Sequence, residues 1–243
     1  MPVPPALPPS QEERPLPHRT AGPARGRAWP TRRVPLRRGA DVTAVCLCAL
    51  QALTNLSLAS AGPGLPPGWA LQRTKGVQPP SFEVTRARTL RIDVLAGAGF
   101  ARYRLRAPLL PRAGALTWRW RTGTPLRDAA LRQRTRDDAP VRVYVVFDDG
   151  RMLLYTWGNK EGRGERFLSG TGPSRAVIVL ERAEDADGSW HMERRDPFAD
   201  YRVAFNRASR ALVAVGAGAD THRLKGRAVA EVSELTWELG ARP

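Results

Sequence analysis

Cysteine is nearly missing from this chain. The only two cysteines, Cys46 and Cys48, lie in one apolar run, and none follows them. The sequence after that run therefore excludes a disulfide framework, a cysteine-ligated zinc site and a thiol nucleophile. If this part of the chain is exported, its hydrophobic core alone must stabilise it.

Lysine is also scarce, although the chain is strongly basic. The formal net charge is +16, yet only three of the 39 basic residues are lysines: Lys75, Lys160 and Lys225. The arginines are scattered, often alternate with apolar residues, and form no cluster with stacking aromatics. Because a nucleic-acid reader module is expected to show such a cluster, we predict no nucleic-acid partner.

A long apolar run occurs near the start, over residues 42–58. Residues 1–40 are rich in proline and arginine and show no hydrophobic period, so we expect them to be disordered. A basic flank precedes the run and Ala59-Ser60-Ala61 ends it, which is typical of a secretory signal. Polar residues inside the run make it a poor membrane anchor. We therefore predict a leader with a cleaved signal peptide over 1–61, no stable membrane span after cleavage, and a periplasmic or secreted location. The alternative for the run is a buried N-terminal helix.

Residues 62–243 mostly alternate between apolar and polar side chains, which is typical of strands with one buried face. The segment 116–121 alternates cleanly, whereas 141–147 is apolar on both faces and predicts a central strand. One helix is expected at 197–206, where Asp196 is a good N-cap and a proline follows it. Many strands, one helix and no βαβ alternation predict a single mostly β domain, an antiparallel β-sandwich or jelly roll.

Several motifs follow one another along the chain. They are Leu-Pro-Pro-Gly-Trp at 65–69, Trp-Arg-Trp at 118–120, the stretch 137–148, Tyr-Thr-Trp-Gly-Asn at 155–159, and Trp190 with Glu193-Arg194-Arg195-Asp196 and Asp200-Tyr201-Arg202. Taken in order, they resemble a bacterial family known as domain-of-unknown-function family 3047. The resemblance runs from about Leu65 to Trp237 and implies export, but it brings no established activity. The chain departs from the family at 218–222, where family members tend to be acidic and amide-rich.

Two acidic pairs flank the expected central strand. Asp137 and Asp138 precede it, and Asp148 and Asp149 follow it, about 30 Å away because a strand rises about 3.3 Å per residue. The two pairs therefore cannot form one site. Turn chemistry before Gly150 explains the second pair. Asp137 and Asp138 either pair with nearby arginines or contribute oxygen ligands to a Ca²⁺ site. We expect no other cofactor.

Aromatic residues offer a second candidate site. Trp118 and Trp120 share one face of a strand, which is the face that a core would use. Trp157 instead ends a strand beside a glycine-rich loop. We therefore predict that Trp157 contacts a ligand together with Tyr155 and Asn159, and that the ligand is a sugar stacked on the ring.

The segment 190–196 is the third candidate. In a strand, His191, Glu193 and Arg195 share a face, so Glu193 with His191 would suit acid–base work and Arg195 would suit ligand binding. The alternative is an ion-pair network that seats the following helix. A glycosidase needs two opposed carboxylates, and the sequence shows no second one. Near the C-terminus, an Asp and a His at 220 and 222 are too few ligands for zinc.

These observations predict a non-enzymatic exported β-sandwich domain that binds carbohydrate or another cell-envelope component. No catalytic residue and no metal ligand are assigned. One alternative is a glycan-active hydrolase or lyase that uses Glu193 or Asp138. A further alternative is a structural envelope protein, which would show an exposed apolar patch. The oligomeric state stays open.

Overall fold

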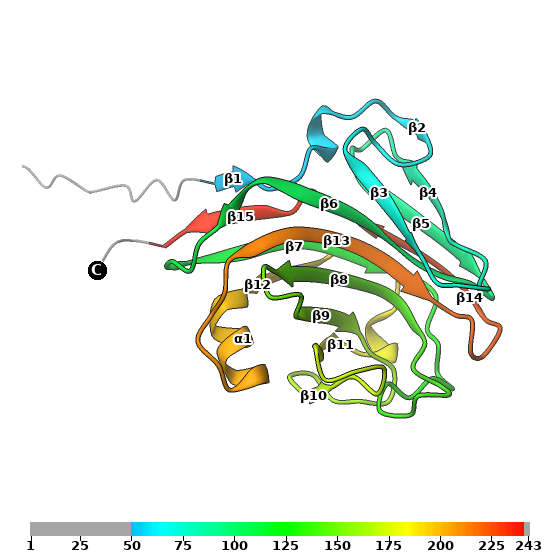
Figure 1. Cartoon of the computed structure of the whole chain (residues 1–243). Helices are drawn as coiled ribbons and strands as arrows, with labels where there is room; N and C mark the ends of the chain where they lie inside the picture. The colour runs from blue at the N-terminus through cyan, green and yellow to red at the C-terminus, as the bar shows by residue number, and fades with distance from the viewer. Residues whose placement is uncertain (1–49, 241–243) are drawn as a thin grey trace, which may run out of the picture. The chain divides into compact units, whose positions relative to one another are not determined.

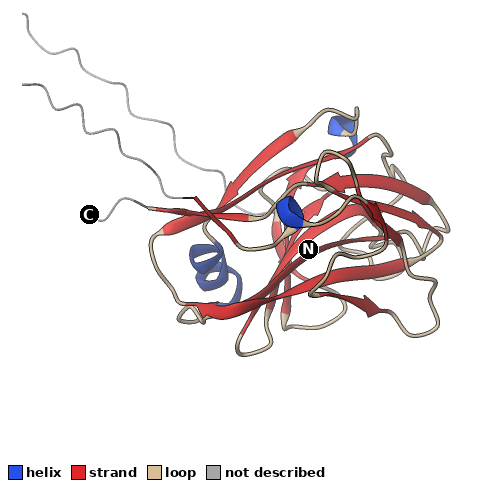
Figure 2. Cartoon of the chain, turned by 90° about the horizontal axis from the view of Figure 1, so that it is seen from above, coloured by secondary structure: helices blue, strands red, loops and turns tan. Residues whose placement is uncertain are grey.

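Two β-sheets packed face to face form the domain in the computed structural model, which describes residues 50–240 (Figures 1 and 2). Every strand pair is antiparallel except β9 with β11. The prediction of a mostly β sandwich with one short helix is therefore confirmed. No described helix has the length and apolar character that crossing a membrane requires.

One sheet has eight strands. Its hydrogen-bonded path is β1 (Leu50–Ala52), β15 (Thr236–Leu239), β7 (Gly114–Thr122), β14 (Arg227–Val232), β5 (Leu90–Leu95), β4 (Ser81–Val84) and β2 (Gly62–Pro63). Off this path, β12 (His191–Arg195) pairs with β7, so that Glu193 stands opposite Trp118.

The other sheet has seven strands. Its path is β10 (Arg166–Leu168), β11 (Arg175–Glu181), β9 (Met152–Trp157), β8 (Ala139–Phe147), β13 (Leu212–Asp220), β6 (Ala98–Leu109) and β3 (Trp69–Arg73). All nine residues of β8 are buried, as its apolar sequence predicts. Two short 3-10 helices, η1 (Leu56–Leu58) and η2 (Ala183–Asp185), complete the connections.

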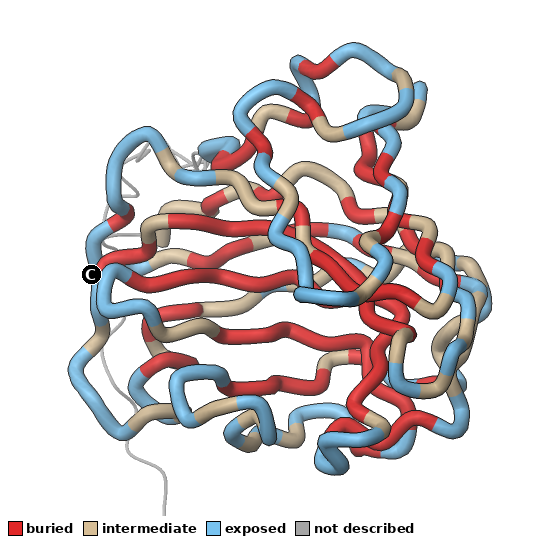
Figure 3. Tube along the Cα trace, turned by 45° about the vertical axis from the view of Figure 1, so that its right-hand side comes forward, coloured by how far each residue is buried: buried red, intermediate tan, exposed pale blue. Residues whose placement is uncertain are grey.

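The main core lies between the two sheets. Trp118 and Trp120 of one sheet meet Tyr155 and Trp157 of the other, with ring centroids 5.3 Å apart for Trp118 and Tyr155 and 5.5 Å for Trp120 and Trp157. The prediction that Trp118 and Trp120 pack in the core is therefore confirmed. Figure 3 shows buried residues in long runs along the strands and exposed residues gathered in the loops.

Within residues 50–240 the single α-helix is α1 (Pro197–Phe205), which closes one end of the sandwich (Figure 1). The Asp196 carboxylate accepts hydrogen bonds from the N–H groups of Phe198 and Ala199 at 2.9 and 3.0 Å, so the predicted N-cap is confirmed. Phe198 and Tyr201 pack against Phe147 of β8. The helix is thus anchored by two aromatic residues of its own.

The segment 50–61, which the sequence assigns to the cleaved leader, lies against the domain. The Leu53 N–H donates to the Leu235 carbonyl at 2.8 Å, and Leu56 is fully buried in the core. The packed domain therefore begins before the expected boundary at residue 61. The rest of the expected leader, and both cysteines, lie outside the described residues.

Candidate functional site

A groove of about 650 Å³ lies on the outer face of the seven-stranded sheet. We call it the sheet-face groove. Its floor is apolar and consists of alternate residues of neighbouring strands: Tyr144 and Val146 of β8, Leu154 of β9 and Val177 of β11. Alternate side chains of a strand point to the same face, so the residues between them face the other sheet. This sheet therefore has two apolar faces, and the second sheet covers only one of them.

Glycines on β13 make room for the rings beside the floor. Gly216 pairs with Tyr144 across the sheet, and a methyl group at Gly216 would lie 2.6 Å from Cζ of that ring. A methyl group at Gly218 would lie 2.6 Å from Cδ1 of Phe100. Both separations are well inside van der Waals contact. The two aromatic rings can therefore lie over β13 only because these positions have no side chain.

Phe100 and Tyr144 form an edge-to-face pair, with centroids 5.2 Å apart. The Tyr144 hydroxyl donates to the Ala101 carbonyl at 3.2 Å. Burial raises the pKa of Tyr144 well above its usual range, so the hydroxyl stays protonated and keeps this bond. Tyr144 is almost wholly buried, whereas Phe100 is half-buried and lines the groove. Phe100 is thus the ring that a ligand can reach.

Arginines are the commonest polar residues in the lining of the groove. Arg102 of β6 is half-buried beside Tyr144, and Arg73 and Arg175 are exposed at the rim. Arg142 of β8 is only 6% exposed. One of its terminal nitrogens donates to the Asp137 carbonyl, while its Nε–H has no hydrogen-bond partner. A buried guanidinium with a free donor is costly unless something else binds it.

One end of the groove is acidic. The Asp138 carboxylate accepts the N–H groups of Arg223 and Leu224 at 3.1 and 2.8 Å. Nδ1 of His222 lies 2.5 Å from Oδ1 of Asp220. Burial raises the pKa of Asp138, and the neighbouring Asp220 raises it further. The hydrogen bonds from the two N–H groups lower this pKa, but by less.

This acidic end offers a three-residue cation arrangement. Ligand atoms of Asp138, Asp220 and His222 lie within 4.8 Å of one another. Calcium takes six to eight oxygen ligands, so these three residues alone do not complete such a site. Asp137, which was predicted as a calcium ligand with Asp138, lines the groove beside them, and one of its oxygens, Oδ1, has no hydrogen-bond partner.

The predicted binding aromatics lie elsewhere. Trp157 and Tyr155 are fully buried between the sheets. The Trp157 indole N–H donates to the Arg182 carbonyl at 2.8 Å. Neither ring therefore has a free face on which a sugar could stack. Asn159 is also buried, and its Nδ2 donates to the Asp138 carbonyl at 3.0 Å.

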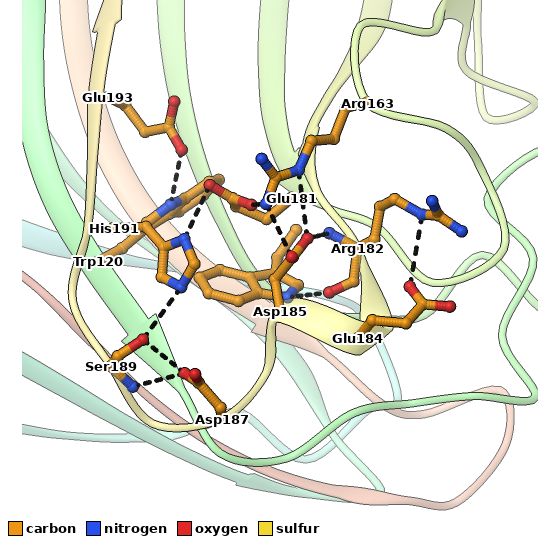
Figure 4. Close-up of polar contacts among 11 residues, drawn as sticks. Trp120, Arg163, Glu181, Arg182, Glu184, Asp185, Asp187, Ser189, His191 and Glu193 are labelled. Atoms are coloured by element: carbon orange, nitrogen blue, oxygen red, sulfur yellow. Dashed lines mark hydrogen bonds and ion pairs between the residues drawn. The ribbon is translucent and has the colours of Figure 1, made fainter.

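Glu193 lies in a polar cluster between β12 and β11 (Figure 4). The indole N–H of Trp120 donates to Glu193 Oε1 at 3.0 Å, and His191 Nδ1 lies 3.0 Å from Oε1 of Glu181. Arg163 bridges Glu181 and Asp185 at 2.5 and 2.7 Å. The second carboxylate that the sequence did not show is thus Glu181, which lies close enough to Glu193 to raise its pKa.

The pKa of Glu193 is raised to about 7. Burial is the largest cause, and the charge of Glu181 adds to it. Arg195 lies on the same strand face, but its guanidinium binds Asp200 at 2.5 Å, and Asp200 also accepts the Tyr155 hydroxyl at 3.0 Å. Arg195 therefore belongs to a network that seats α1, the structural alternative that the sequence allowed.

Of the residues predicted as ligand contacts, only Asp137 lines the groove. Phe100, Arg102 and Arg142 were missed. One signal for them was present, because Arg142 is the single charged residue in the apolar stretch 141–147. The glycines at alternate positions 216 and 218 were a second signal, since they leave space over one face of a strand.

The fold and the groove together define a β-sandwich domain with an apolar-floored groove on one sheet face. Residues 68–236 match the family described as protein of unknown function, DUF3047. This is more than half of the chain, so the chain belongs to that family. No curated protein matches the chain.

Solved structures similar to this chain include a xyloglucanase domain and a carbohydrate-binding module. One is the xyloglucanase domain of a type three effector from Sinorhizobium fredii, with 10% identity, a TM-score of 0.44, and coverage of 78% of this chain and 97% of that chain. Another is the family 11 carbohydrate-binding module of Clostridium thermocellum, with 6% identity, a TM-score of 0.42, and coverage of 80% and 98%. At this level of similarity nothing follows about the ligand of this chain.

Proposed function

We propose that this chain is an exported, non-enzymatic carbohydrate-binding domain that holds a glycan segment in the sheet-face groove. The observation that carries the proposal is the combination of an apolar floor and a polar rim in one open groove. Small-molecule sites typically combine an apolar lining with a few well-placed polar groups. Export is supported by the basic flank and the apolar run of residues 37–58.

A sugar suits this lining for a chemical reason. A pyranose ring presents C–H groups on its faces and hydroxyl groups around its edge. The half-buried ring of Phe100, with Met152 and Val213, offers an apolar surface for the C–H face. Rim side chains such as Gln72 and Thr171 offer hydrogen-bonding groups to the hydroxyls.

The carboxylate pairs do not favour the hydrolase alternative. Glycosidases place their two carboxyl groups about 5 to 9.5 Å apart, so that a glycosidic bond or a water molecule fits between them. Glu193 and Glu181 instead interact directly, and ligand oxygens of Asp138 and Asp220 lie within 4.8 Å of each other. Glu193 also points into the space between the sheets, on the far side of the seven-stranded sheet from the groove.

Affinity electrophoresis of the full chain through gels containing soluble polysaccharides tests the proposal, after a glycan array has chosen the polysaccharides. We expect Phe100→Ala to weaken retention about tenfold, because it removes the reachable ring of the groove. Phe205→Ala is the matched control, since Phe205 is also a half-buried ring but lies on α1 and outside the groove. The proposal fails if no polysaccharide retards the protein, or if Phe100→Ala binds as well as the unchanged chain.

A further inference from the structure

The sheet-face groove carries more positive charge than its own acidic residues balance. Five arginines line it: Arg73, Arg102, Arg142, Arg175 and Arg223. Three aspartates line it, and each has a partner of its own. Asp148 pairs with Arg210 at 2.9 Å, Asp220 lies 2.5 Å from His222, and Asp137 lies 3.9 Å from Arg223.

Four of these arginines have no carboxylate within ion-pair distance anywhere in residues 50–240: Arg73, Arg102, Arg142 and Arg175. Arg175 reaches only the Thr171 hydroxyl, at 3.3 Å. Arg102 is the most informative of these arginines. It is half-buried on the same strand face as Phe100, and its guanidinium makes no hydrogen bond within residues 50–240.

Arg142 gives independent evidence for an anion. Only 6% of Arg142 is exposed, and its Nε–H has no hydrogen-bond partner. A guanidinium cannot lose its proton in a protein, so this charge persists in a poorly solvated position. Its only hydrogen bond in the described chain goes to a neutral carbonyl, that of Asp137. A carboxylate or sulfate oxygen from a ligand would satisfy the free donor and the charge together.

We infer that the sheet-face groove binds a glycan that carries acidic groups, with Arg102 and Arg142 as the side chains that contact them. This inference rests on the proposed carbohydrate-binding function and adds the chemical class of the sugar. Uronate carboxylates and sulfate esters share the required chemistry, since both present two or more anionic oxygens to a guanidinium. Neutral glycans would leave Arg73, Arg102 and Arg175 without a counter-charge and the Nε–H of Arg142 without an acceptor.

Isothermal titration of the full chain with paired polysaccharides tests the inference. Polygalacturonate is compared with the same polymer after methyl esterification, and dextran sulfate with dextran, so each pair differs in charge and shares its backbone. We expect the acidic member of at least one pair to bind tenfold or more tightly than its neutral partner, and the affinity to fall as salt rises. The pair that shows the difference identifies carboxylate or sulfate as the recognised group.

A variant pair then locates the contact. We expect Arg102→Gln to weaken binding of the acidic polymer about tenfold, as for the loss of one charged hydrogen bond. Arg104→Gln is the matched control, because Arg104 lies two residues further along the same strand face, exposed and outside the groove. Arg102 is preferred to Arg142 for this test, since a change at the buried Arg142 would disturb folding.

Equal binding of the charged and neutral members of each pair would overturn this inference and leave the proposed function intact. No binding of any polysaccharide would remove both. Equal affinity for single-stranded DNA would also overturn it, because the groove would then respond to charge alone. The inference would also be overturned if Arg102→Gln and Arg104→Gln weakened binding of the acidic polymer equally.

Discussion

The carboxyl group of Glu193 is expected to hold a proton up to neutral pH and to make the domain less stable above it. Glu193 lies in contact with Glu181, and burial together with that neighbouring charge raises its pKa from an ordinary 4.5 to about 7. Burial also raises the pKa of Glu181. His191, Arg163, Arg195 and Asp185 are the other charged or titratable groups that face the pair.

The size of the effect follows from the shift in pKa. A rise from 4.5 to about 7 corresponds to about 3 kcal/mol, at 1.36 kcal/mol per pH unit. Because the folded-state pKa is the higher one, the folded state binds the proton more tightly. The stabilisation is therefore complete below pH 4.5 and is lost as pH rises through 7. Sharing of the proton with Glu181 makes about 3 kcal/mol an upper limit.

The test replaces Glu193 with glutamine and measures urea unfolding at several pH values from 5 to 8. A glutamine oxygen still accepts the Trp120 indole N–H, and its NH₂ group can donate to Glu181. We expect the unchanged chain to lose up to about 3 kcal/mol of unfolding free energy over this range. The Glu193→Gln variant should lose much less and should be the more stable protein at pH 8.

Glu184→Gln provides the control, because Glu184 is exposed on η2 and outside the contact with Glu193. Its pH profile should match that of the unchanged chain. The reasoning is refuted if Glu193→Gln keeps the full pH dependence, or if the unchanged chain becomes more stable between pH 5 and pH 8.

Three further changes test the packing. Gly216→Ala should lower the unfolding free energy by about 3 kcal/mol in a denaturant titration, because the new methyl group would lie 2.1 Å from the Ala101 carbonyl oxygen and 2.6 Å from the Tyr144 ring. Gly123→Ala, where the nearest atom is 3.9 Å away, should be nearly neutral, and equal effects would contradict the argument. Asp196→Ala should cost about 1 kcal/mol and Asp196→Asn much less, since asparagine also caps a helix; calorimetry that finds no difference between them and the unchanged chain would rule out this cap. A chain that begins at residue 62 should be less stable by about 3 kcal/mol or more than one that keeps 50–61, because two buried leucines are lost; equal melting temperatures would show that 50–61 contributes nothing.

Local features predicted the elements well. The alternation at 116–121 became β7, the apolar stretch 141–147 lies within β8, and Asp196 with its proline begins α1 as expected. These features depend on residues close in sequence, so they can be predicted from the sequence alone. The prediction for 50–61 differs from the structure because an apolar run suits a signal peptide and a packed terminal segment equally well.

The sheet-face groove was harder to predict from the sequence than the strands and the helix. Trp157 ends a strand beside a glycine-rich loop, which favoured a binding role, yet its ring faces the second sheet and is buried. Alternation assigns residues to two faces of a strand but does not say which face another sheet will cover. The same ambiguity hid Tyr144 and Arg142, which point away from the core and toward the groove.

By itself the sequence determined a cysteine-free β domain with one capped helix, because those properties rest on composition and on contacts between near neighbours. Only the tertiary structure decided where a ligand can bind. The groove combines β6, β8 and β13, three strands far apart in the chain, and the two glycines of β13 create its space only after the rings of β6 and β8 are placed beside them. Such a surface depends on strand order and register, which no local pattern encodes.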